Sequence, residues 1–84
     1  MVRSEVLERV TEICRDIFED EELVMTEATT AADVERWDSL THLSLINEIE
    51  VEYDVTFTLA EVKGSKNFGE LMNALMKHLA AKQE

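Results

Sequence analysis

The sequence of 84 residues contains one cysteine, Cys14, and lacks long apolar runs. A single cysteine cannot form an internal disulfide, which excludes a disulfide-rich secreted scaffold, and metal binding is an equally poor fit. No apolar run exceeds three residues, which excludes a membrane-spanning segment. Residues 1–5 lack the apolar core of a signal peptide, so we expect a cytoplasmic protein without membrane insertion.

Basic residues are also scarce: 8 lysines and arginines face 19 acidic residues, and the formal net charge is -11. Such a charge repels nucleic acid and anionic lipid and attracts proteins with basic docking surfaces. The apolar residues recur at regular intervals, which indicates a folded chain rather than a disordered acidic tail. At this length we expect one domain, residues 1–84, that is monomeric and too small for a large active-site cleft.

The first half of the chain predicts two amphipathic helices. Apolar residues recur at helical spacing from Val6 to Ile17, with Ser4 as the expected N-cap. A second helix is predicted to start near Ser39, and its inward face is formed by Leu45, Ile46, Ile49 and Tyr53.

The stretch from Glu19 to Asp38 is long for a connection in a compact domain, and we interpret it as a functional loop. Trp37 is expected to anchor its end by burial, because large aromatic residues stabilise mainly through the area that they bury. Four further apolar residues are expected to hold the loop against the helices: Leu23, Val24, Met25 and Val34.

The second half predicts an extended segment, a short helix and a longer helix. Residues 55–58 alternate in polarity, which turns Phe57 inward. Thr58 and Glu61 have the spacing of a capping box, and Gly64 is expected to end the short helix. A similar cap, Asn67 with Glu70, precedes the last apolar stripe, formed by Phe68, Leu71, Met72, Leu75 and Leu79.

The predicted fold class is therefore all-α, a small four-helix bundle with three main helices, one short helix and a long loop between the first and second helices. The shared core is expected to contain Ile46, Ile49, Phe57, Val62, Leu71 and Leu75.

One segment carries a specific motif. Asp38-Ser39-Leu40 lies at the predicted start of the second helix, after a long loop, in a chain whose helices follow in a characteristic order. The tripeptide in this setting resembles the attachment motif of acyl and peptidyl carrier proteins, and the resemblance extends over essentially the whole chain. It implies a four-helix bundle of the acyl-carrier type.

The resemblance assigns roles to two residues. In carrier proteins the matching serine, here Ser39, is esterified by 4'-phosphopantetheine, which a phosphopantetheinyl transferase takes from coenzyme A. The thiol of this arm holds acyl intermediates as thioesters, and the carrier itself catalyses nothing. The matching aspartate, here Asp38, assists the transferase as a metal-coordinating or proton-accepting neighbour. We also expect Asp38 to cap the helix, and the helix N-terminus to offer unpaired amides and positive dipole to the phosphodiester.

The same helix is the expected partner-binding surface. From Trp37 to Val62 there is no lysine or arginine, so the region is strongly negative and suits rapid, transient binding of basic enzymes. These enzymes are the transferase and the acyl-loading and acyl-processing enzymes of fatty acid, polyketide or related biosynthesis. The residues expected to contact them are Leu40, Leu43, Asn47, Glu48, Glu50 and Glu52.

Other functions stay open at this point. The cargo of a carrier could be aminoacyl or peptidyl rather than acyl, and an acidic adaptor without a prosthetic group would leave Ser39 unmodified. An enzyme would use Cys14 as nucleophile with His42 or His78 as base. The apolar neighbours of Cys14 and the missing glycine-rich setting argue against it, and both histidines are expected at the surface or its boundary. The acidic run of residues 19–22 lacks the pattern of a calcium loop.

Overall fold

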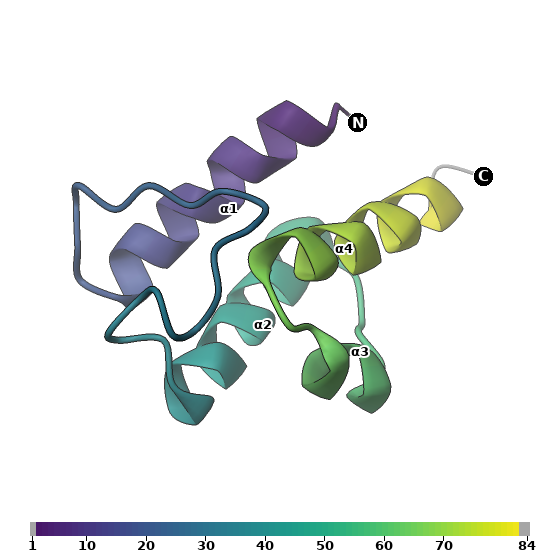
Figure 1. Cartoon of the computed structure of the whole chain (residues 1–84). Helices are drawn as coiled ribbons and strands as arrows, with labels where there is room; N and C mark the ends of the chain where they lie inside the picture. Colours follow the sequence, from purple (N-terminus) through teal and green to yellow (C-terminus); the bar gives the residue numbers. More distant parts are fainter. Residues whose placement is uncertain (1, 83–84) are drawn as a thin grey trace.

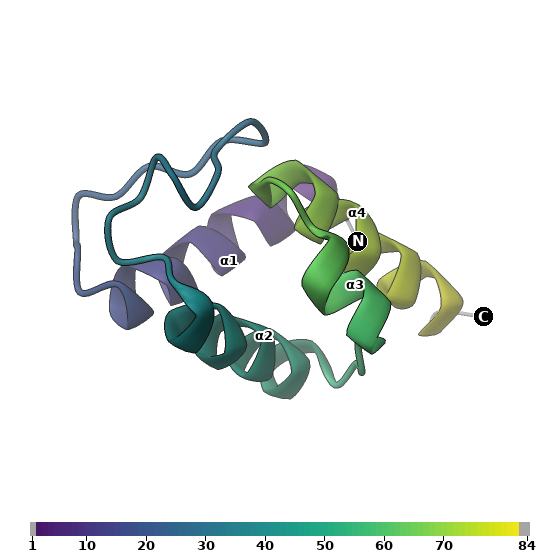
Figure 2. The ribbon, with the colours of Figure 1, turned by 60° about the horizontal axis from the view of Figure 1, so that its bottom comes forward.

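The computed structural model describes residues 2–82. Within this range it contains four helices and no strand. The helices are α1 (Arg3–Ile17), α2 (Ser39–Tyr53), α3 (Leu59–Gly64) and α4 (Phe68–Lys82). Helix α1 packs against α2 and α4, and the short α3 packs against α4 (Figures 1 and 2). The all-α prediction, with three main helices and one short one, is confirmed. Within residues 2–82, no helix combines the length and apolar character needed to cross a bilayer.

The core lies between α1, α2 and α4, because each presents apolar residues at a spacing of three or four. Leu45 and Ile49 of α2 and Leu75 of α4 have no exposed surface. Cys14 is buried among them, as its place on the apolar stripe of α1 predicts. The predicted core residues are buried with one exception, since Val62 on α3 is only partly buried and packs against the edge of the core.

The expected N-cap of α1 was wrong. Ser4 lies inside the first turn, because the helix begins at Arg3 and the Val2 carbonyl accepts the first helical hydrogen bond from Val6 N at 3.1 Å. Arg3 is held in place by contacts distant in sequence, an ion pair with Glu27 at 2.6 Å and a hydrogen bond to the Gly69 carbonyl at 3.2 Å. These two contacts fix the backbone at Arg3, so the helix begins one residue before Ser4, the N-cap that the local sequence predicts.

The long loop between α1 and α2 runs along the outside of the helices (Figure 1). Met25 and Val34 are buried and Leu23 packs against the core, as expected. Val24 is 71% exposed, so the prediction that it holds the loop was wrong. In an extended segment successive side chains point to opposite sides, so Val24 faces solvent when its two neighbours face inward.

The loop also caps α4. The carbonyls of Thr29 and Glu27 accept hydrogen bonds from Phe68 N at 2.7 Å and from Gly69 N at 2.8 Å. This close approach requires a glycine at position 69, because a Cβ atom there would lie 2.7 Å from the Glu27 carbonyl oxygen. The backbone of the loop therefore satisfies amides that a helix start leaves free.

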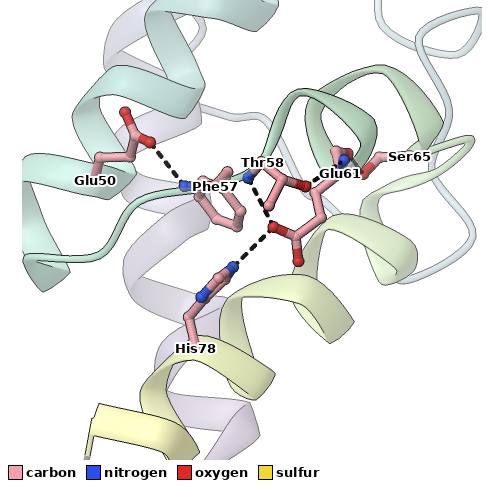
Figure 3. Close-up of polar contacts among 6 residues, drawn as sticks. All are labelled: Glu50, Phe57, Thr58, Glu61, Ser65 and His78. Carbon is pink, nitrogen blue, oxygen red and sulfur yellow. Dashed lines mark hydrogen bonds and ion pairs between the residues drawn. The ribbon is translucent and has the colours of Figure 1, made fainter.

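Helix α3 has no fully buried residue, and polar contacts hold it instead. Thr58 and Glu61 form the predicted capping box, and Gly64 is the last helical residue, as expected. The Glu61 carboxylate also contacts His78 Nε2 of α4 at 2.8 Å, and the Glu50 carboxylate of α2 accepts from Phe57 N at 2.9 Å (Figure 3). Phe57 is buried, as predicted, and its ring meets the His78 ring edge to face at 5.5 Å.

Candidate functional site

Ser39 is the first residue of α2, and its neighbour Asp38 is the N-cap. Asp38 Oδ1 accepts hydrogen bonds from Leu40 N and Thr41 N, each at 3.0 Å, and Thr41 Oγ1 accepts from Asp38 N at 2.8 Å. This reciprocal box starts the helix at one defined residue. The side chain of Asp38 does the capping, so the exposed Ser39 hydroxyl has no part in it.

Asp38 carries a stable negative charge. The hydrogen bond from the Thr41 amide, with further help from the Thr41 hydroxyl and the Leu40 amide, holds the pKa of the Asp38 carboxyl below its ordinary value. A carboxylate next to Ser39 is available to an enzyme as a proton acceptor or a metal ligand, but it also repels any anion attached to Ser39.

One expectation about this helix start needs correction. The amides of Leu40 and Thr41 are not unpaired, because Asp38 Oδ1 binds both, and His42 N donates to the Asp38 carbonyl at 2.8 Å. A capping aspartate competes with an external anion for the same donors. The start of α2 therefore offers a phosphate the helix dipole but few free amides.

Ser39 opens onto a groove of about 540 Å³ between the start of α2 and α3. Figure 1 shows α3 and the start of α2 at the same end of the bundle. The groove is lined by Ala31 and Trp37 of the loop, by Asp38, by Ser39, His42 and Leu43 of α2, by Leu59, Val62 and Lys63 of α3, and by Ser65 and Lys66 beyond it. The sequence did not predict this groove, since it joins segments that are far apart along the chain.

His42 links the loop, α2 and α3 at the base of this groove. The Trp37 indole N–H can only donate, and it lies 3.0 Å from His42 Nδ1, so Nδ1 is the acceptor. The imidazole proton is then on Nε2, which donates to the Val62 carbonyl at 3.0 Å. Both bonds require the neutral form of His42. The sequence placed this residue at the surface boundary, where it lies, but did not predict either bond.

Of the six predicted partner residues, four are exposed without a side-chain hydrogen bond or ion pair in the described part of the chain, and two have internal partners. Leu40 and Leu43 are 75% and 58% exposed, and Asn47 and Glu48 are also exposed. Glu50 is half-buried and bonded to Phe57 N, and Glu52 forms an ion pair with Arg9 at 2.8 Å that lowers the pKa of the Glu52 carboxyl.

One surface residue of α2 was missed. Val51 is 72% exposed and lies one helical turn beyond Asn47 and three turns beyond Leu40, on the same face of the helix. The helical period would have identified it, but the predicted surface included only leucines and polar residues.

The residues of the rival enzyme site do not form one. Burial raises the pKa of the Cys14 thiol to about 12, so the thiol is protonated at neutral pH and closed to substrate. His42 is bonded to Trp37 and Val62, and His78 to Glu61. Within residues 2–82 no three His, Cys, Asp or Glu side chains are grouped so that they could hold a metal ion.

The site fits a serine-linked phosphodiester arm. Ser39 is exposed at the mouth of an open groove, the first turn of α2 contains no acidic residue, and two lysines line the groove. An arm attached at Ser39 therefore meets space and positive charge on one side. Asp38 is the only acidic residue among the groove-lining side chains.

The chain is similar to the holo acyl carrier protein from Geobacter metallireducens, known from a solution NMR structure. The two share 42% sequence identity and a TM-score of 0.86, and the match covers 92% of this chain and 88% of that chain. No protein-family model and no curated protein matches the chain. Identity at this level over nearly the full length of both chains extends beyond a shared fold to shared descent, and the chain therefore belongs to the acyl carrier protein family.

Proposed function

We propose that this protein carries acyl groups as thioesters on a 4'-phosphopantetheine arm attached to Ser39. The observation that carries the proposal is the position of Ser39: exposed at the start of α2, on an open groove, beside an ionised Asp38, in a chain 42% identical to a holo carrier. In the attachment step Ser39 Oγ gives its proton to a base at the transferase site and bonds to the pantetheine phosphorus, while the pyrophosphate bond of coenzyme A breaks and adenosine 3',5'-bisphosphate leaves. The arm supplies a terminal thiol; the protein supplies its attachment point and recognition surface.

Asp38 is proposed to assist the transferase through its second oxygen. Oδ1 is occupied by two backbone amides, while Oδ2 has no hydrogen-bond partner within the described residues. A carboxylate held by one oxygen keeps the other correctly oriented for a metal ion or for the proton of the Ser39 hydroxyl. The lowered pKa of Asp38 keeps it in the form that both tasks require.

The proposed docking surface comprises Leu40, Leu43, Asn47 and Glu48. Glu50 and Glu52 add to its negative charge, although Glu50 is also bonded to Phe57 N and Glu52 is paired with Arg9. Exposed leucines beside a free carboxylate suit transient contact with basic enzymes, because charge speeds encounter and a small apolar area limits affinity. Likeness to an acyl carrier favours acyl over aminoacyl cargo.

The test of attachment is the intact mass after incubation with coenzyme A and a broad-specificity phosphopantetheinyl transferase. We expect a gain of one phosphopantetheine, located to Ser39 by peptide mapping and absent in Ser39→Ala. The alanine variant should stay folded, because Asp38 rather than Ser39 caps the helix. An unmodified wild-type protein would support the adaptor alternative, and loading by amino-acid-activating rather than acyl-transferring enzymes would reassign the cargo.

The docking surface is tested separately by Glu48→Lys, which changes a side chain without an internal partner within the described residues. We expect slower loading by a basic transferase and a flatter dependence on ionic strength, since salt screens the attraction that Glu48 provides. Glu22→Lys, an equal charge change in the long loop, is the control. Equal rates for both variants would remove Glu48 from the docking surface.

A further inference from the structure

Most of the basic residues have acidic or carbonyl partners inside the protein. Ion pairs join Arg3 to Glu27, Arg9 to Glu12 and Glu52, Arg36 to Glu19 and Lys82 to Asp54, and Arg15 donates to the Leu23 carbonyl. The three other cations, Lys63, Lys66 and Lys77, form no ion pair with any residue in the range 2–82.

Two of these three lysines line the groove beside Ser39. Lys63 is in the last turn of α3 and Lys66 follows it in the connection to α4, so both reach the groove from the side opposite α2. They are the only basic residues between Trp37 and Met76. The one carboxylate lining the groove is Asp38, and His42 is neutral, so the side chains of the groove carry a net positive charge.

Such a charge would stabilise a phosphodiester on Ser39. The phosphodiester would add a negative charge next to the ionised Asp38 in an already acidic protein. The helix amides that usually bind phosphate are occupied, since Asp38 Oδ1 holds those of Leu40 and Thr41. The first turn of α2 contributes no basic side chain, and the neutral His42 has both nitrogens engaged. Apart from the helix dipole of α2, the remaining source of positive charge among the side chains of this groove is the pair of lysines.

We propose that Lys63 and Lys66 bind the phosphodiester of the arm on Ser39 and so hold the first part of the arm across the groove. This inference rests on the proposed attachment at Ser39. Lysine suits the task, because its flexible stem and compact ammonium group can follow an anion without a preformed pocket. The contact also joins α3 to the start of α2 in the holo protein, adding a link at the end of the molecule where α3 has no fully buried residue.

The inference is tested on the apo and holo proteins with a free thiol, so that no cargo is present. Lysine side-chain NMR signals are compared before and after attachment of the arm. We expect the signals of Lys63 and Lys66 to shift and that of Lys77, the matched control without an ion-pair partner, to stay in place. The phosphorus signal of the holo protein should move in the double variant Lys63→Gln/Lys66→Gln and remain unchanged in Lys77→Gln. Lysine shifts that appear only after an acyl group bearing a carboxylate is loaded would assign the pair to the cargo instead and overturn the proposal.

Stability gives an independent readout. The difference between the unfolding temperatures of the holo and apo forms should fall by roughly 1–6 °C in the double variant, and the effect should shrink at high salt. The inference is contradicted if the holo–apo difference in unfolding temperature is the same in the double variant and the Lys63 and Lys66 signals do not shift on attachment of the arm. Mass spectrometry separates this failure from a failure of the proposed function: a protein that never gains the arm contradicts both, whereas a modified protein with silent lysines contradicts only the lysine contact.

Discussion

The half of the molecule formed by α1, α2 and α4 is held by apolar burial, whereas α3 is held mainly by directed polar contacts. Leu45, Ile49 and Leu75 are fully buried in the first half, while no residue of α3 is. Helix α3 is attached by the bond from His42 to the Val62 carbonyl, by the contact between Glu61 and His78, and by the partial packing of Val62 against the core. The capping box at Thr58 fixes where the helix starts. Segments with little apolar burial open at lower free energy than the core. The wall of the groove beside Ser39 can therefore move while the core stays folded.

The largest effect is expected in the core. Ile49→Ala removes a fully buried side chain between α1, α2 and α4 and should lower the free energy of unfolding by about 2–5 kcal/mol, a large part of the stability of so small a domain. Urea denaturation measures this change. Val51→Ala on the exposed face of the same helix is the control and should change stability by less than about 0.5 kcal/mol. Similar midpoints for the two variants would show that α2 is rotated relative to the core.

The next effect tests the contact between the long loop and α4. Gly69→Ala places a Cβ atom 2.7 Å from the Glu27 carbonyl oxygen, so the loop must shift and weaken its caps on α4. We expect a loss of about 1–3 kcal/mol in urea denaturation. The same substitution at Gly64, where a Cβ atom would meet nothing within 4 Å, provides the control. Equal stability of the two variants would contradict the close approach.

Substitution of His42 tests whether polar contacts attach α3 to the rest of the molecule. His42→Ala leaves the N–H of the buried Trp37 without its acceptor and removes the bond to the Val62 carbonyl, which should cost about 1–3 kcal/mol. His42→Gln can supply both an acceptor and a donor and should recover part of the loss. The fluorescence of Trp37, the sole tryptophan, reports the change directly. If the alanine variant kept the wild-type stability and emission, the two bonds would be absent in solution.

The smallest effect is the contribution of Glu61 in α3 to the pH dependence of stability. The hydrogen bond from Thr58 N, followed by the contact with His78, lowers the pKa of the Glu61 carboxyl below its ordinary value. Stability from this group is therefore present above the usual glutamate range, near pH 4.3, and is lost as the pH falls through the lowered pKa. Glu61→Gln removes the titrating group, so urea midpoints at about pH 6 and about pH 3.5 should differ less in this variant than in the wild type. Glu48→Gln serves as the control and should keep the full difference.

Features that depend on neighbours in the sequence were predictable. The capping aspartate, the box at Thr58 and the apolar stripes act within one or two helical turns, so their spacing predicts them. Ser39 at the start of α2 follows from the same local rules, which is why the attachment motif could be located before the fold was known.

Features that depend on distant segments were not predictable. Ser4 lost its expected role because Arg3 is bound by Glu27 and Gly69, and Val24 faces solvent because its neighbours pack inward. The bonds of His42 join residues up to twenty positions apart. No short-range pattern encodes such pairs.

By itself, the sequence determined the number and order of the helices, the capping boxes of α2 and α3, most of the core and the position of Ser39, because helical spacing and capping boxes are properties of residues close together in the chain. The tertiary structure decided what surrounds Ser39. The groove, the neutral state of His42, and the two lysines that line the groove together with Asp38 all arise where α2, α3 and the loop meet. The physical reason is that charge balance and hydrogen-bond pairing depend on distances through space, which the order of residues along the chain leaves undetermined.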